Sequence, residues 1–378
     1  MSIARKLEEW QKAGLLTPEA AAAILAHEAH QSRPYLLYAI GGLGALTIVL
    51  GVVAIIASNW EDIPGGIKLA ADLAVVAAVA VGVLAADRRG RAWLRELLIA
   101  IEVGLVLASI GLISQVYHLG GATWQALLAW AVLTAPLATR GRTRGLATAW
   151  VLGLHVTYYM ALEPVYDALR DDALIAGLVG LPPLLCLVAA TSPAIARWRP
   201  HYARALASLG WTGALTLATA GTFAFYDAPF SDPAGVLVGA AGAAALVGLL
   251  VARAARLVHG HPAAVGPLRA LLVLLIALGY GPLALGADDL NLVGALAFLV
   301  LWAAVAWVAH ATHNVRLLNL ATAILGLRLL AVYFEVFGSL LDTGLGLITG
   351  GLVTIGITYL WARSRKGFAA HLAEEPPR

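Results

Sequence analysis

The sequence predicts an all-α integral membrane protein with about twelve transmembrane helices, and three observations support this. Of its 378 residues, 61% are hydrophobic and only 12% are charged, about half the charged fraction of a typical soluble domain. Apolar stretches of about 20 residues recur along the chain, long enough as helices to cross the roughly 30 Å hydrocarbon core of a bilayer. Basic and acidic residues are concentrated in alternate segments between these stretches.

Residues 1–34 come first and predict a polar, amphipathic helical hairpin. Leu7 and Trp10 recur at helical spacing, and Gly14 is expected to end this first helix. Thr17 followed by Pro18 is typical of the N-cap and first position of a second helix, which we expect over about 18–30. The hairpin is interpreted either as a small solvated cap or as a module that docks a cytoplasmic protein partner.

The apolar stretches that follow form two groups of six. The first group covers residues 35–190, with predicted spans at 35–57, 67–86, 97–116, 123–138, 146–162 and 173–190. The second covers residues 205–361, with predicted spans at 205–226, 235–251, 268–285, 291–309, 317–334 and 341–361. Residues 362–378 form a polar tail, which we expect in the cytoplasm.

The distribution of charged residues between the predicted spans is an independent test of the number of spans. If the loops are assigned alternately to the two sides of the membrane, all 25 Lys and Arg residues except Lys68, Arg170 and Arg328 fall on the side that holds both termini. The opposite loops are rich in Asp and Glu. Because loops with an excess of Lys and Arg stay in the cytoplasm, both termini are predicted to be cytoplasmic.

A weak internal repeat relates the two groups of spans. Residues 44–47 recur as residues 213–216, and the same offset places the first six spans on the last six. Two parallel six-helix halves would explain this, and chance similarity between alanine-rich segments is the alternative. The offset also places Pro182 and Pro183 opposite Gly350 and Gly351. Such paired interruptions point either to a transporter binding site or to close helix packing.

Asp72, Glu102, His155 and Arg328 lie inside predicted spans, where an isolated charge at a helix centre costs about 2.5–3.5 kcal/mol. Asp72 has a local partner in Lys68, one turn earlier. Since Asp72 is assigned to Lys68, Glu102 and Arg328 form the preferred ion pair. The pair is interpreted either as a contact that fixes helix packing or as part of a functional site. His155 is interpreted as a hydrogen-bonded core histidine, with a proton relay as the alternative.

Gln115 and His118 follow the third span at the predicted outer face. Together with Asn59 and Trp60 they could line a shared vestibule, and anchoring at the membrane interface explains them nearly as well.

Several other kinds of site are excluded or unsupported. The single cysteine, Cys186, excludes an internal disulfide and a cysteine metal cluster. The pair His259 and His261 has no further ligand nearby, so no metal site is predicted. No nucleophile, metal or phosphate-loop motif occurs, so we expect neither an enzyme nor a cofactor. No basic stripe indicates binding to nucleic acid.

Three segments carry a family resemblance: LEEWQKAGLL at residues 7–16, ASNW at 57–60 and GLISQVYHLGG at 111–121. They resemble the uncharacterised bacterial membrane-protein family called domain of unknown function 2157. The resemblance covers roughly residues 1–140, with a weaker similarity over 315–366. It implies a multi-pass protein of the bacterial cytoplasmic (inner) membrane, with no established activity and no functional residues to carry over.

Two classes of function fit these observations. The first is a carrier or flippase-like transporter of a small anionic or polar-headgroup substrate, coupled to protons. Its binding residues would come from the set Glu102, Arg328, His155, Asp72, Gln115 and His118. The second is a structural or regulatory membrane protein that docks partners through residues 1–34. A polar cavity between the helices favours the carrier, and a filled interior favours the scaffold.

Overall fold

The computed structural model describes residues 7, 10–31, 47, 60–226, 234–258, 260–285, 291–337, 352 and 356. It has two compact units, residues 1–70 and 71–378, which are described separately. Within the described residues all regular secondary structure is helical, as the sequence predicts. The predicted spans at 35–57 and 341–361 lie almost wholly outside these residues, as do Gly350 and Gly351.

The first unit contains the predicted helix break and restart. Leu15 N–H donates to the carbonyl of Trp10 at 2.9 Å, and Gly14 adopts a φ of 68°. This left-handed glycine and the bond from the following residue are typical of a helix C-terminus. The hydroxyl of Thr17 then accepts from Ala20 N–H at 3.2 Å, which caps α2 (Pro18–Gln31). The predicted end of the first helix near Gly14 and the predicted start of the second at Pro18 are confirmed.

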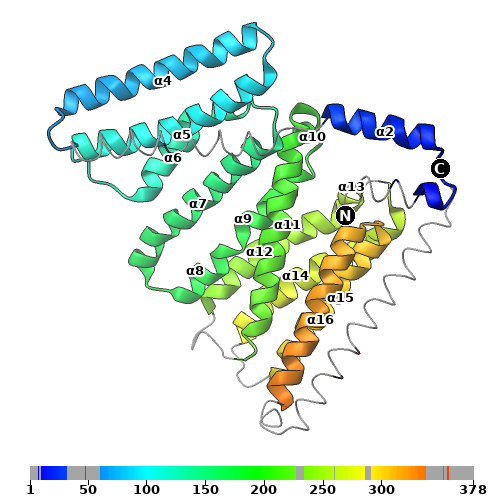
Figure 1. Cartoon of the computed structure of the whole chain (residues 1–378). Coiled ribbons are helices and arrows are strands. Elements are labelled where there is room, and N and C mark those ends of the chain that lie inside the picture. The colour runs from blue at the N-terminus through cyan, green and yellow to red at the C-terminus, as the bar shows by residue number, and fades with distance from the viewer. Residues whose placement is uncertain are drawn as a thin grey trace. The chain divides into compact units, whose positions relative to one another are not determined.

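The second unit is a set of packed helices, and α4 crosses the boundary into it (Figure 1). The helices are α4 (Gly65–Arg88), α5 (Ala92–Val116), α6 (Thr123–Ala138), α7 (Arg144–Leu169), α8 (Asp172–Val179), α9 (Leu181–Ala190), α10 (Pro193–Trp198), α11 (Pro200–Phe223), α12 (Ala234–Ala252), α13 (Ala254–Leu257), the 3-10 helix η1 (Pro262–Ala264), α14 (Val265–Leu285), α15 (Asn291–Ala311) and α16 (Val315–Phe337).

Eight helices in the described part of the chain are long and apolar enough to cross a membrane, judged by length and composition. They are α4, α5, α7, α8 with α9, α12, η1 with α14, α15 and α16. The predicted span at 123–138 is a helix of 16 residues, which is shorter than this requirement. The predicted span at 205–226 is α11, which has the length but carries several threonines and glycines. These polar and small residues keep α11 out of the set of eight.

The core of this unit lies among α8, α9, α11, α12, α14, α15 and α16, which share one large cluster of buried apolar side chains. Glycines allow the helices to approach closely. A Cβ atom on Gly239 of α12 would overlap the carbonyl of Gly177 on α8, and one on Gly221 would overlap the carbonyl of Leu278 on α14. Small residues at such crossings are typical of helix packing in membranes.

The predicted span at 173–190 is interrupted in the middle. Helix α8 ends at Val179, Gly180 adopts a turn, and α9 begins at Leu181. Pro182 and Pro183 occupy the first positions of α9 and have no N–H to donate to the carbonyls of the preceding turn. The carbonyls of Leu178 and Val179 therefore lose their usual helical donors, although Gly180 N–H also donates to the carbonyl of Leu178.

Tyrosine side chains from α7 supply the missing donors. The hydroxyl of Tyr158 lies 3.0 Å from the carbonyl oxygen of Leu178, the acceptor that an amide at position 182 would have used. The hydroxyl of Tyr159 lies 3.5 Å from the carbonyl of Val179, the corresponding acceptor for position 183. The interruption is therefore satisfied by protein groups, which favours its interpretation as a packing feature.

Two tryptophans fasten α5, α6 and α7 together. Trp130 Nε1 on α6 donates to the carbonyl of Val103 on α5 at 2.8 Å. Trp150 Nε1 on α7 donates to the Thr134 hydroxyl on α6 at 3.1 Å. Both residues on α6 are buried. These hydrogen bonds fix the helix on which Glu102, the neighbour of Val103, is carried.

Hydrogen bonds also connect the ends of the helices that carry most of the arginines. Arg199 Nε donates to the carbonyl of Thr139 at 2.6 Å, and Arg253 Nη1 donates to the Thr191 hydroxyl at 3.3 Å. The loops that contain these residues therefore lie at a common end of the unit, called here the arginine end.

Candidate functional site

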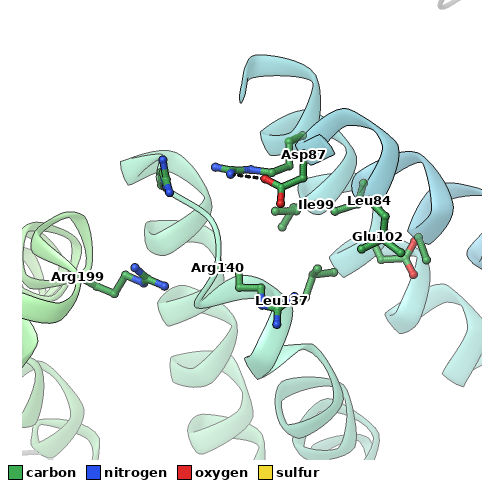
Figure 2. Close-up of a pocket in the computed structure, with 11 residues that line it drawn as sticks. Leu84, Asp87, Ile99, Glu102, Leu137, Arg140 and Arg199 are labelled. Carbon is green, nitrogen blue, oxygen red and sulfur yellow. Dashed lines mark hydrogen bonds and ion pairs between the residues drawn. The ribbon is translucent and has the colours of Figure 1, made fainter. Parts of the chain in front are cut away.

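A pocket of about 600 Å³ opens at the arginine end between α4, α5 and α6 (Figure 2). Its walls combine apolar side chains with six charged ones. The lining residues are Ala80, Val83, Leu84, Asp87, Arg95, Ile99, Glu102, Leu137, Arg140, Arg142 and Arg199. The chemistry of the pocket follows from how these two classes are distributed along it.

The helical repeat explains which residues of α4 and α5 line the pocket. Ala80 and Asp87 are seven residues apart on α4, and Arg95, Ile99 and Glu102 are four and three apart on α5. Residues at these spacings occupy one face of a helix. Since a short turn joins the two helices, Asp87 and Arg95 lie near that turn, and Glu102 lies about 10 Å further along the helix axis. Figure 2 shows Asp87, Ile99 and Glu102 along this side of the pocket.

A network of ionic hydrogen bonds holds the mouth of the pocket. Arg95 bridges two carboxylates, with Nη1 at 2.9 Å from Asp87 Oδ1 and Nη2 at 2.8 Å from Glu96 Oε1. The other oxygen of Glu96 accepts from the backbone N–H groups of Arg142 at 2.7 Å and Thr143 at 3.0 Å. Thr143 is the N-cap of α7, where a negative charge is stabilised by the helix dipole. Glu96 thus ties α5 to the loop that carries Arg140 and Arg142.

Three arginines at the mouth remain available to an anion. The side chains of Arg140 and Arg142 are exposed, and Arg199 is half-buried with its Nε bonded to a backbone carbonyl. Among the described residues, none of these guanidinium groups forms an ion pair with a carboxylate. Arg140 lies in the turn after α6 and Arg199 between α10 and α11, and Figure 2 shows both opposite α4 and α5. The mouth therefore carries an excess of positive charge.

Glu102 occupies the deep end of the pocket and is 6% exposed. Its Oε2 atom has no hydrogen-bond partner in the described part of the chain. An ionised carboxylate that is buried without a partner is strongly unfavourable. The neutral acid is therefore favoured there, and the carboxylate is stabilised only where a cationic group is free to act on it.

The predicted pair between Glu102 and Arg328 is wrong for this structure. Arg328 on α16 is 7% exposed, and its Nη2 donates to the hydroxyl of Tyr226. Its guanidinium carbon lies 5.4 Å from the ring centroid of Phe223, 5.6 Å from that of Tyr226 and 5.7 Å from that of Phe298. Aromatic rings stabilise a cation at these distances, a possibility that elimination among charged residues did not consider.

The pairing predicted for Asp72 is also not formed. Lys68 lies over the Trp60 ring, with its Nζ 4.4 Å from the centroid. In the described residues, Asp72 Oδ2 is buried without a hydrogen-bond partner. A lysine one turn away has several rotamers, and here an aromatic face attracts it instead.

His155 behaves as the hydrogen-bonded core histidine that the sequence favours. Its Nδ1 lies 2.9 Å from the carbonyl of Val151, one turn earlier on α7. Its Nε2 lies 3.7 Å from Cys186 Sγ on α9. His155 is not among the residues that line the pocket with Glu102.

Gln115 and His118 lie at the opposite end of α5 and are exposed. Their backbones close the helix: the N–H of His118 donates to the carbonyl of Gln115 at 3.5 Å, and His118 adopts a φ of 49°. Their proposed partner Asn59 lies outside the described residues. Neither residue lines the pocket.

The alternation of charge along the sequence identifies the arginines of the pocket only as indicators of topology, and it does not point to Glu96. A usable signal was present. Arg95 and Glu102 are seven residues apart, and Arg95 and Glu96 stand together at the start of an apolar stretch. Charged side chains at the start of an apolar helix need partners. The seven-residue spacing places Arg95 on the same face of that helix as Glu102.

No curated protein and no solved structure matches the chain. A family model does match residues 8–147, a range that includes every pocket residue except Arg199. The weaker similarity over 315–366 lies outside this match. Over residues 8–147 the chain therefore carries the sequence pattern of the family described as "Predicted membrane protein (DUF2157)".

Proposed function

We propose that this protein is a carrier of a small anionic or polar-headgroup substrate, which it binds in the pocket between α4, α5 and α6. The observation that carries the proposal is the unpartnered, buried carboxyl of Glu102 beneath a mouth lined by arginines. Ionisable groups inside membrane proteins are expensive and mark pathways for substrates or protons. A scaffold gains no packing energy from such a group.

Glu102 couples substrate to protons in this proposal. An anion held by Arg140, Arg142 and Arg199 adds negative charge to the pocket, which favours the neutral acid at Glu102. When the anion leaves, the arginines favour the carboxylate. A proton would therefore be taken up with the substrate and lost with it.

The proposed topology has twelve spans, in two parallel halves, with both termini in the cytoplasm of a bacterial cell and the chain in its cytoplasmic membrane. The hydrogen bonds that join the arginine-bearing loops support placing those loops on one side. Single cysteines replacing Asp62 or Asp172 should react with an impermeant thiol reagent from outside the cell. A cysteine replacing Arg256 should react only after lysis, and the reverse pattern would invert the topology.

A transport assay tests the function. The full chain is reconstituted into phosphatidylcholine liposomes, and two probes are followed: radiolabelled glycerol 3-phosphate and phosphatidylglycerol with a fluorescent acyl chain. We expect protein-dependent movement of at least one probe, accelerated by a proton gradient. Glu102→Gln should abolish the acceleration, because the variant carries no exchangeable carboxyl proton.

Asp167→Asn serves as the matched control, since this exposed carboxylate on α7 lies outside the pocket. It should retain both the movement and its dependence on the gradient. Absence of movement for both probes, with a folded protein in the membrane, would refute a carrier.

A docking scaffold is the second candidate, and one observation favours it. In the first unit Trp10 is 44% exposed and Leu15 is 73% exposed, although both are large and apolar. Solvent-exposed side chains of this kind often mark protein contacts. Under this alternative, deleting residues 1–33 abolishes the cellular phenotype, whereas Glu102→Gln leaves it unchanged.

A further inference from the structure

The distribution of charge in the pocket indicates the class of substrate. The charged groups other than Glu102 gather at the mouth, whereas Ala80, Val83, Leu84 and Ile99 make the walls apolar. A water-soluble anion loses hydration on all sides when it binds and requires polar partners all around it. In this pocket the cationic partners lie at one end, Glu102 is the single charged residue further along α5, and the wall between them is apolar. The pocket fits an amphipathic molecule with an anionic group at the mouth.

The apolar wall on α4 continues onto a surface that faces outward. Within α4 only Val83 and Ala86 are buried, and Leu84 is 53% and Val81 is 64% exposed. In a bilayer such a surface is covered by acyl chains. The pocket therefore has a lateral side along which an acyl chain can lie while its headgroup enters at the mouth.

We infer that the pocket binds the phosphate-bearing headgroup of an anionic glycerophospholipid from the leaflet at the arginine end, with an acyl chain along α4. This inference rests on the proposed function and specifies its substrate. Guanidinium groups bind phosphate oxygens through paired, charge-assisted hydrogen bonds, which Arg140, Arg142 and Arg199 can supply. Neutral Glu102, about 10 Å deeper, can donate a hydrogen bond to an ester carbonyl of the same lipid.

Native mass spectrometry of the full chain in a neutral detergent tests the inference. The protein is titrated with phosphatidylglycerol, diacylglycerol or inorganic phosphate, and lipid adducts are counted. We expect phosphatidylglycerol to form a saturable adduct and diacylglycerol none. The double variant Arg140→Gln with Arg142→Gln should weaken the adduct about tenfold or more, because two charged contacts are lost.

The matched control is Arg256→Gln with Arg316→Gln. These two arginines also carry exposed side chains beside helix ends, but they do not line the pocket. The control should change the affinity by less than about twofold. An equal loss in both double variants would reduce the effect to general attraction of anionic lipid and overturn the inference.

A second variant keeps every charge and changes only the apolar wall. Ala80→Phe places a ring in the space assigned to the lipid and should weaken the phosphatidylglycerol adduct as well. If inorganic phosphate protects the protein against thermal unfolding and Ala80→Phe has no effect on lipid adducts, the site takes a free anion and the inference fails.

The transport assay distinguishes a failure of the lipid-binding inference from a failure of the proposed carrier function. Specific lipid binding without movement of either probe would support the inference and refute a carrier. Movement of glycerol 3-phosphate without specific lipid binding would support a carrier and refute the inference.

Discussion

The hairpin of α4 and α5 and the bundle of α11 to α16 are built from similar residues but packed in different ways. Helix α4 buries only Val83 and Ala86, whereas α14 buries residues along its whole length. The buried cluster around α5 and α6 is small, and the one shared by α8, α9, α11, α12, α14, α15 and α16 is much larger. Loose packing leaves room for the pocket, and ligand sites are commonly drawn from the less stable parts of a fold.

The two regions also differ in what surrounds their buried charged side chains. In the bundle, Arg328 is enclosed by three aromatic rings and a tyrosine hydroxyl. At the hairpin, Arg95 is bonded to two carboxylates while Glu102 is left without a partner for one oxygen. The buried charge in the bundle therefore contacts aromatic side chains, whereas at the hairpin one buried carboxyl oxygen has no hydrogen-bond partner among the described residues.

The largest expected effect is a difference in stability between the substitution of one leucine in the bundle and of one in the hairpin. Leu272→Ala removes a fully buried side chain of α14 and should lower the free energy of unfolding by about 2–5 kcal/mol. Leu84→Ala, on the exposed face of α4, should change it by less than about 0.5 kcal/mol. Thermal unfolding in detergent measures both. Similar losses would mean that the hairpin is as tightly packed as the bundle.

The next contrast is between two glutamates of α5. Glu96→Gln removes an ion pair and weakens two backbone hydrogen bonds, so it should destabilise the protein by about 1–3 kcal/mol. Glu102→Gln removes a buried carboxyl whose Oε2 has no partner and should be neutral or stabilising. Thermal unfolding at neutral pH distinguishes them, and a larger loss at Glu102 would show that it has a structural partner after all.

A smaller effect is expected at the interrupted helix that adjoins the bundle. Tyr158→Phe leaves the carbonyl of Leu178 without its hydroxyl donor and should cost about 1 kcal/mol. Tyr117→Phe, an exposed tyrosine, is the control and should have no effect. Replacing Pro182 and Pro183 with alanine restores the amide donors, so the same tyrosine change should cost less in that background. Equal costs in both backgrounds would remove the link between tyrosines and prolines.

The smallest effect concerns His201, which precedes the predicted span at 205–226 and is 6% exposed. Burial lowers the pKa of His201, and the nearby Arg199 and Arg204 act in the same direction, partly offset by a hydrogen bond to the Gly141 backbone and by Glu96. A lowered pKa gives stability that is present above the ordinary value of about 6.5 and is lost as the pH falls. The wild type should therefore lose more thermal stability than His201→Gln between pH 7.5 and 5.5. Parallel losses would contradict this.

The sequence predicted the helical elements well, because their signals are local. Gly14, Thr17 and Pro18 determine where helices end and begin through backbone geometry and capping, which neighbouring residues decide. The interruption near Pro182 was predicted for the same reason. The hydroxyl groups that hydrogen-bond to the carbonyls at the interruption belong to Tyr158 and Tyr159, which are on another helix. Helical periodicity alone could not identify that contact.

Of the residues that the sequence indicates as candidates, Glu102 alone lines the candidate pocket. Glu102 was singled out because a carboxyl group in an apolar stretch is costly, and it does line the pocket. The predicted pairing of Glu102 with Arg328 is not formed, because charge complementarity among ionisable residues leaves out the aromatic rings that also stabilise Arg328. The role of Glu96 depends on the fold of a loop some 46 residues away along the chain, where it binds the N–H of Arg142.

The hydrogen bonds between the tyrosines of α7 and the interrupted helix predict that Tyr158 and Pro182 evolved together. A proline could enter position 182 at little cost only in an ancestor whose Tyr158 could already donate a hydrogen bond to Leu178. Once Pro182 was present, loss of that tyrosine would leave the carbonyl of Leu178 with only the N–H of Gly180 as a donor, which is unfavourable. Among related chains we therefore expect the two positions to change together, with the tyrosine older than the proline. The order of these substitutions, read from a phylogeny, would record how the turn at Gly180 arose.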